Sequence, residues 1–298
     1  MLLAGLVAAA GWTALVADAL AASRPGAITH DFIEYITSDR ILVGAEIEKI
    51  IAILTITVVL ALAISRARRL LIHSVAERSA ARELSRFFDP GIAARIRDSE
   101  HHIRVGRGEA CEGAILIFDI RGFTALFDHL EPNEVMALLA EYQARLIPII
   151  QNHGGSIGKF LGDGVIATFG VARPSPAYAA DATVELDEAL AEIDRWNAHR
   201  HTAGLDPVAV NAALTIGPVI FGAVGDDTRL EYTVIGEPVN LAAKLDKHNK
   251  KSGTRALATQ DAFATALAQG YRPEAPRQTR RACRVDGTDA PVDLVVLA

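Results

Sequence analysis

The chain has 298 residues and a formal net charge of −6, from 30 lysines and arginines against 36 aspartates and glutamates. This length exceeds that of one ordinary domain, and the charge balance gives no indication of a nucleic-acid partner. Hydrophobic residues make up 50% of the chain, which excludes disordered and collagen-like proteins. The two cysteines, Cys111 and Cys283, are too far apart for a CxxC metal knuckle, so we expect both to be reduced in the cytosol.

The excess hydrophobicity lies in two runs near the N-terminus. With their flanking residues these runs predict membrane spans at about 2–22 and 47–65, close to the ~20 residues that a bilayer core requires. The sequence therefore predicts a membrane region over residues 1–65, with residues 23–46 as an external loop. We expect the lipid bilayer to be a partner of this region.

The residues that flank the two runs fix the expected orientation. Arg66, Arg68 and Arg69 follow the second run directly, which is typical of a cytoplasmic flank. The alternative for the second run is a buried core helix. The first run has a different alternative, a cleaved signal peptide, because Ala19 and Ala21 resemble a signal-peptidase site. The absence of a basic residue ahead of the first run favours a span.

Residues 66–109 form a basic segment rich in alanine, arginine and leucine. The segment predicts a juxtamembrane helix that ends near Asp89, followed by a short helix from Ile92 to Arg97. The apolar spacing is compatible with a signalling coiled coil and equally with a plain linker helix.

Residues 110–298 predict a single cytoplasmic domain. An apolar run from Ala114 ends at Asp119, which is typical of a central strand. Two short apolar runs joined by the Gly-Asp-Gly turn at 162–164 predict a β-hairpin. Hairpins and separate helices together predict an α+β fold with a mainly antiparallel sheet. The expected strands cover 114–120, 156–161, 165–169, 208–216, 219–224, 231–235 and 292–297, and the expected helices cover 131–152, 177–201, 238–247 and 261–267.

Asp119 and Asp163 are the candidate metal ligands. Asp119 ends a strand and Asp163 lies in the hairpin turn, so the two carboxylates converge if those strands are neighbours. Hard cations such as Mg²⁺ prefer oxygen ligands, usually one or two carboxylates together with substrate phosphates. The chain has no GxxxxGK[ST] phosphate-binding loop, so cations and basic side chains would hold a nucleotide. The alternative is purely structural, with Asp163 serving the turn and Asp119 capping the strand.

Three ordered motifs resemble those of the class III nucleotidyl cyclase homology domain. They are segments 118–124 (FDIRGFT), 159–163 (KFLGD) and 232–245 (YTVIGEPVNLAAKL). Segment 84–90 (LSRFFDP) resembles the stretch often found just ahead of that domain in bacterial members. The resemblance covers roughly 110–298 and implies a ferredoxin-like cyclase catalytic domain. It also implies a homodimer, in which each site is built across the interface.

The resemblance assigns roles to individual residues. Asp119 and Asp163 match the two metal-binding aspartates, and the backbone carbonyl of Ile120 matches a further ligand, for two Mg²⁺ or Mn²⁺ ions per site. Lys159 matches the purine-reading lysine, which the partner chain supplies. Its ammonium can donate to adenine N1, whereas guanine N1 carries a hydrogen. Thr233 occupies the second purine-reading position, where its hydroxyl can accept from the adenine amino group.

Two positions depart from the family pattern. Asn240 matches the asparagine that orients the ribose, but Lys244, four residues later, stands where the family usually has arginine. Lysine keeps the positive charge but lacks the planar guanidinium group, which can donate two parallel hydrogen bonds. Thr288 stands where a basic residue for the terminal phosphates is expected, and Arg281 or Arg284 is a candidate substitute. Both departures concern the rate and leave the purine assignment unchanged.

The resemblance implies an adenylate cyclase that converts ATP to 3′,5′-cyclic AMP and pyrophosphate. It would be a multi-pass protein of the bacterial inner membrane with a cytoplasmic catalytic domain. The alternative is a degenerate cyclase-homology module that binds nucleotide or dimerises with little turnover. A third interpretation is a sensor whose outer loop binds a ligand, but residues 23–46 are few for a sensing domain.

Overall fold

The computed structural model describes residues 2–22, 28–38, 40–85, 89–98, 106–127, 130–226 and 228–298. Parts of the predicted external loop, the LSRFFDP segment and the linker lie outside these residues. The chain divides into two compact units, Met1–Leu84 and Ser85–Ala298, and each is described by itself.

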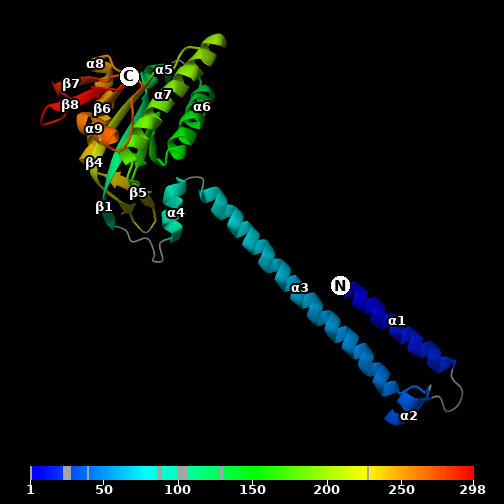
Figure 1. The fold of residues 1–298 in the computed structure, drawn as a ribbon. Coiled ribbons are helices and arrows are strands. Elements are labelled where there is room, and N and C mark those ends of the chain that lie inside the picture. Colours follow the sequence, from blue (N-terminus) through cyan, green and yellow to red (C-terminus); the bar gives the residue numbers. More distant parts are fainter. Residues whose placement is uncertain are drawn as a thin grey trace. The chain divides into compact units, whose positions relative to one another are not determined.

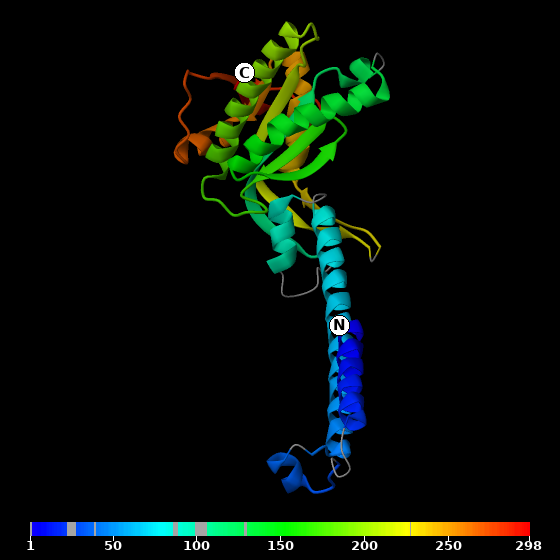
Figure 2. The same ribbon diagram turned by 90° about the vertical axis from the view of Figure 1, so that its right-hand side faces the viewer.

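The N-terminal unit is a helical hairpin. Helix α1 (Leu2–Ala21) and helix α3 (Val43–Ser85) lie side by side (Figures 1 and 2), and the short helix α2 (Phe32–Thr37) lies between them in sequence. A Cβ atom at Gly5 would overlap the side chain of Thr57, so a glycine is needed where the two helices touch. Both long helices are apolar and long enough to cross a membrane by length and composition, at Leu2–Ala21 and Val43–Arg69. A signal sequence near the N-terminus would meet the same criterion as the first of them.

A polar cluster ties the three helices of this unit together. Glu46 of α3 is buried, and its carboxylate accepts hydrogen bonds from Trp12 Nε1 of α1 (3.0 Å) and from the Tyr35 hydroxyl of α2 (2.9 Å). Lys49 donates to the same carboxylate (2.8 Å) and lies over the Trp12 and Tyr35 rings. These contacts fix one end of the hairpin.

Helix α3 continues well beyond the predicted span. The predicted span at 47–65 and the predicted linker helix are one continuous helix of 43 residues. The side chains of residues 70–85 lie outside the described part of the chain, so the choice between coiled coil and plain linker helix remains a prediction.

The C-terminal unit has the ferredoxin-like βαββαβ order that the family resemblance implies. Its elements are α4 (Pro90–Asp98), β1 (Gly108–Ile120), α5 (Phe123–Phe127), α6 (Pro132–Asn152), β2 (Ser156–Leu161), β3 (Gly164–Phe169), α7 (Tyr178–Thr202), β4 (Val210–Gly225), β5 (Leu230–Ile235), α8 (Glu237–Ser252), β6 (Ala256–Thr259), α9 (Gln260–Ala268), β7 (Gln278–Cys283) and β8 (Val292–Val296). Strands β2, β3, β1 and β4 lie next to one another in that order, and the sheet continues through β6, β8 and β7, with β5 paired to β4. Among these described strands, all pairings are antiparallel except the parallel pair β4–β6.

Strand β1 separates two cores, because successive side chains of a strand point to opposite faces. Leu116 and Phe118 pack in the main core with residues of α6 and α7, which cover one face of the sheet (Figure 1). Ile115 and Ile117 pack on the other face with Ala242 of α8. Asp119 continues this second set, so its side chain lies on the α8 face.

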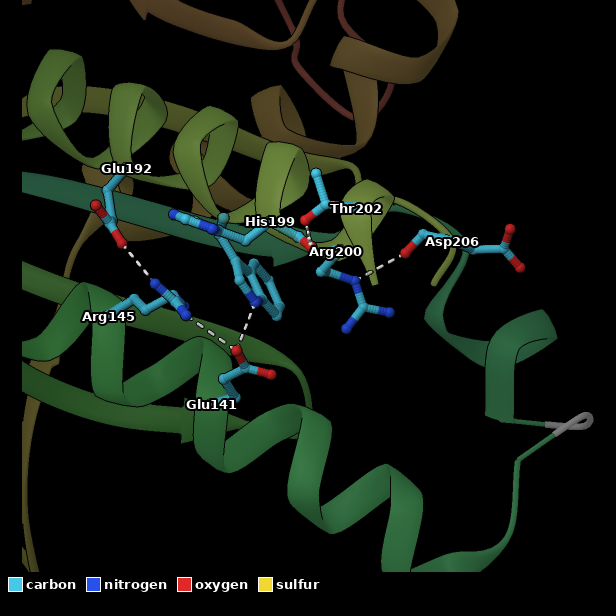
Figure 3. Close-up of polar contacts among 8 residues, drawn as sticks. Glu141, Arg145, Glu192, His199, Arg200, Thr202 and Asp206 are labelled. Atoms are coloured by element: carbon cyan, nitrogen blue, oxygen red, sulfur yellow. Dashed lines mark hydrogen bonds and ion pairs between the residues drawn. The ribbon is translucent and has the colours of Figure 1, made fainter. Parts of the chain in front are cut away.

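Helices α6 and α7 are joined by charged and aromatic contacts. Arg145 of α6 bridges Glu192 of α7 (2.8 Å) and Glu141 of its own helix (3.0 Å), as Figure 3 shows. Trp196 of α7 donates its indole N–H to Glu141 at 2.7 Å. The two helices therefore form a fixed layer against which β1 is held.

The predicted strands 208–216 and 219–224 are wrong as separate elements. They form one strand, β4, because β1 is long enough to pair with both halves. Gly113 pairs with Gly217 and Glu112 with Pro218, so the ladder runs through the Gly-Pro step. The first half of β4 also pairs with β6, and the second half with β5.

Helix α4 is attached to the sheet by Asp89. The Asp89 carboxylate accepts from the backbone N–H of Gly91 (2.7 Å), which caps α4, and from that of Ile157 in β2 (3.0 Å). Both oxygens of this buried side chain are thus used. One residue sets both the start of α4 and its position on β2.

We expect Asp89→Ala to destabilise the C-terminal unit by about 2 kcal/mol or more, because it removes a helix cap and leaves a buried N–H of Ile157 unsatisfied. Thr259→Ala is the matched control. Thr259 caps only α9, by accepting from Ala262 N–H at 3.3 Å, and its loss should cost about 1 kcal/mol. Thermal unfolding of both variants measures the difference. Equal destabilisation would contradict the role of Asp89 as a tie to β2.

Candidate active site

The fold brings Asp119 and Asp163 together at the carboxyl end of β1. Strand β3 lies antiparallel beside β1, so the β2–β3 turn that carries Asp163 adjoins the end of β1. The Asp163 carboxylate accepts from the Ile120 backbone N–H at 3.2 Å. Gly162 has φ of 65°, a left-handed conformation that glycine adopts without strain. The glycine therefore allows the tight turn that brings Asp163 to Ile120.

A third carboxylate, Asp246 of α8, belongs to the same group. Burial, followed by the charges of Asp246 and Asp163, raises the pKa of Asp119 to about 7. Burial, followed by the charge of Asp163, raises the pKa of Asp246 to about 6. Asp246 is not among the residues predicted for the site, and the signal that could have identified it is its place one helical turn after Ala242, on the buried face of α8.

The donor set fits a hard divalent cation. Asp119 and Asp163 offer carboxylate oxygens, and β1 ends beside them at Ile120, whose carbonyl is the predicted further ligand. Among the described residues, no group of three or more His, Cys, Asp and Glu side chains could hold a metal by itself. Two carboxylates with substrate phosphates and water are the usual ligands of Mg²⁺, so this incomplete set is the expected one.

The predicted purine-reading residues meet at a different place on the chain. Lys159 of β2 and Thr233 of β5 line an open cavity of about 370 Å³ together with Asn240 of α8. Lys159 forms an ion pair with Glu231 at 3.1 Å, and Glu231 precedes Thr233 by two residues on the same strand. Glu231 is a further lining residue, which is not among the residues predicted for the site. Neither Asp119 nor Asp163 lines this cavity.

Helix α8 has a buried face and an exposed face that carry different polar side chains. Asn240 and Lys244 are four residues apart and share one face. Ala242, Leu245 and Asp246 are buried on the face that covers the sheet. One chain thus presents Asp246 to its own Asp119 and turns Asn240 and Lys244 away from that carboxylate group.

The loop that follows β7 is close to Lys244. The Lys244 ammonium contacts the carbonyl of Gly287, and the Thr288 hydroxyl donates to the Val285 carbonyl at 2.8 Å. Thr288 is therefore used within its own turn. Arg281 and Arg284 are both exposed near this loop.

Comparison with known proteins gives a family match over most of the C-terminal unit. Residues 109–266 match the adenylate and guanylate cyclase catalytic domain. An adenylate cyclase of Anabaena cylindrica is 32% identical over 163 residues, which is 53% of this chain and 32% of that protein. Adenylate cyclase 1 of Rhizobium meliloti (strain 1021) is 30% identical over 151 residues, 50% of this chain and 22% of that protein. The chain thus spans less than a third of the length of these curated relatives.

Solved structures agree with the family match. The crystal structure of the guanylyl cyclase Cya2 has a TM-score of 0.56 and 26% identity, covering 63% of this chain and 92% of that one. The adenylyl cyclase CyaB from P. aeruginosa has a TM-score of 0.55 and 25% identity, covering 64% and 96%. Because both adenylyl and guanylyl cyclases are similar to this chain, the comparisons do not select the purine.

The raised pKa of Asp119 predicts a pH dependence of the metal-free protein. In the unfolded chain this group ionises near its ordinary value of 3.8, and in the fold it ionises near 7. The fold therefore binds more protons than the unfolded chain between these values, and its stability falls as pH rises through this window.

The Asp119→Asn substitution should reduce the loss of stability as pH rises. The variant should therefore be more heat-stable than the wild type at pH 8 in the presence of a chelator. Thermal unfolding between pH 4 and pH 8 measures the effect. Asp261→Asn, which removes an exposed carboxylate on α9, is the control and should follow the wild type. Identical pH profiles of Asp119→Asn and the wild type would contradict the electrostatic description of the site.

Proposed function

Because the chain belongs to the family of adenylate and guanylate cyclase catalytic domains, we propose that it is an adenylate cyclase. The reaction would convert ATP to 3′,5′-cyclic AMP and pyrophosphate. The observation that carries the proposal is the convergence of Asp119 and Asp163 at the end of β1, in a unit that also presents Lys159, Thr233 and Asn240 to one cavity. A degenerate module would have no need for this costly group of acids, of which Asp119 and Asp163 are half-buried and Asp246 is buried.

The cavity residues support adenine over guanine. The Lys159 ammonium can donate to adenine N1, which is an acceptor, but it meets an N–H at the same place in guanine. The Thr233 hydroxyl can accept from the adenine amino group. Glu231 pairs with Lys159 and so holds the ammonium at the mouth of the cavity. The pair is half-exposed, so an incoming base can compete for the ammonium.

The remaining roles follow from charge and position. Asp119 and Asp163 would hold divalent cations, Mg²⁺ or Mn²⁺, two per site. When bound, such ions lower the pKa of the ribose 3′-hydroxyl and neutralise the triphosphate. The Asn240 amide would orient the ribose so that its 3′ oxygen attacks the α-phosphorus and pyrophosphate leaves. The Lys244 ammonium would stabilise the negative charge that develops, with less directional contact than arginine gives.

We infer that two chains share each site. Within one chain neither Asp119 nor Asp163 lines the cavity, and α8 turns Asn240 away from Asp246. An exposed apolar surface surrounds the cavity, and a second copy of the chain could bind there. Its members lie on β2, β4 and β5, and they are Phe160, Leu161, Ile220, Val224, Leu230 and Ile235.

The two apolar helices support a membrane-anchored enzyme. A span at Leu2–Ala21 and a second within Val43–Arg69 would place residues 23–46 outside and the catalytic domain in the cytoplasm. The arginines at 66, 68 and 69 agree with this orientation. In a bacterium the membrane would be the inner membrane.

We expect the purified full chain, in detergent with Mn²⁺ or Mg²⁺, to produce cyclic AMP from ATP and to use GTP less efficiently. Asp119→Ala and Asp163→Ala should each reduce turnover to below a few per cent, because each removes a carboxylate ligand. Asp261→Asn should keep wild-type activity. Retained activity in either alanine variant would contradict the assignment of the cation site, and a preference for GTP would contradict the purine assignment.

The proposed topology predicts where fused reporters become active. A reporter fused after Arg69 should be active in the cytoplasm, and one fused at Thr37 should be active in the periplasm and stay with the membrane fraction. Release of the Thr37 fusion into the soluble periplasm would show that the first helix is a cleaved signal peptide.

A further inference from the structure

Asp246 is a buried carboxylate to which no role has been assigned so far. It is 7% exposed, and its Oδ1 atom accepts no hydrogen bond from any described residue. Removing a carboxylate from water without a partner is costly, so a buried group of this kind calls for a compensating charge or a water ligand.

The position of Asp246 on α8 directs it toward the predicted cation site. Ala242, one turn earlier, packs with Ile115 and Ile117 on the second face of the sheet. Strand β1 continues on that face to Asp119, and α8 continues to Asp246. The charge of Asp246 is accordingly the largest charge effect on Asp119, ahead of the charge of Asp163.

The positive groups near Asp246 do not neutralise it. Arg121 donates from Nε and Nη2 to the Asn211 side-chain oxygen (3.0 and 2.5 Å), and Nη2 also donates to the Thr254 carbonyl (2.7 Å). Lys247 is exposed on the next position of the helix. Within the described part of the chain, neither cation forms an ion pair with Asp246.

We propose that Asp246 is a positioning residue of the cation site, where its carboxylate accepts hydrogen bonds from the water ligands of a divalent cation held by Asp119 and Asp163. A water-mediated role agrees with the lack, among the described residues, of any group of three or more His, Cys, Asp and Glu side chains that could hold a metal ion. Mg²⁺ and Mn²⁺ bound by one or two carboxylates keep several waters, and these waters need acceptors. This inference rests on the proposed function, because the cation site at Asp119 and Asp163 is part of that proposal.

The test is binding of Mn²⁺ alone to the full chain in detergent. Electron paramagnetic resonance of the free ion measures how much Mn²⁺ remains unbound. Asp246→Asn should weaken Mn²⁺ binding by about 10- to 100-fold, the usual effect of losing an outer partner of a metal site. Asp246→Glu, which keeps the charge, should bind more tightly than Asp246→Asn. Asp261→Asn is the charge-matched control and should bind as the wild type does. Asp119→Asn should lose binding.

Thermal unfolding separates this role from a structural one. Without metal, Asp246→Asn should be at least as heat-stable as the wild type, because it removes a buried charge from among like charges. Added Mn²⁺ should then raise its melting temperature less than that of the wild type. A metal-free Asp246→Asn variant that is unfolded or less stable would overturn the proposal, as would wild-type Mn²⁺ affinity in that variant.

The two proposals fail in different ways. If Asp119→Asn loses Mn²⁺ and Asp246→Asn binds it normally, the role of Asp246 is wrong and the cation site stands. If the wild type does not bind Mn²⁺, or if Asp119→Asn binds it as the wild type does, the proposed cation site itself is wrong and the role of Asp246 falls with it.

Discussion

Asp119, Asp163 and Asp246 bring negative charge to the carboxyl end of β1, where burial removes much of the water that would screen it. The surrounding structure resists the repulsion. Strand β1 pairs along its length with β4, its other edge pairs with β3, and the α6–α7 layer covers the opposite face. Because the scaffold holds the carboxylates in place before a cation arrives, binding of a divalent cation would relieve repulsion that the fold already bears.

The two faces of α8 explain how one domain could contribute to two different halves of a shared site. The inner face presents Asp246 to the carboxylates of the same chain, while Asn240 and Lys244 lie on the other face, where Asn240 lines the cavity together with Lys159. Each chain would then contribute a cation half and a purine half. A two-fold arrangement would complete two equivalent sites, and catalysis would depend on how the chains associate.

Local patterns predicted most of the elements, because hydrophobic periodicity and the Gly-Asp-Gly turn depend on short stretches of sequence. The approach of Asp163 to the end of β1 followed from a strand end and a hairpin turn. Strand β4 was divided wrongly, because a Gly-Pro step predicts a break unless a long partner strand is known. Asp246 was missed because it lies among lysines on α8, where an acid resembles an ordinary solvent-exposed residue, and only the packing of α8 on β1 buries it.

The most direct test of a shared site is complementation between two inactive chains, Asp119→Ala and Asn240→Ala. Each variant damages both sites of its own dimer. A mixed dimer carries both lesions in one site and leaves the other intact, so equal mixing should restore about a quarter of wild-type cyclic AMP production, since about half of the dimers are mixed. If the chains demonstrably exchange and the mixture stays as inactive as either variant alone, the site lies within one chain and the account is wrong.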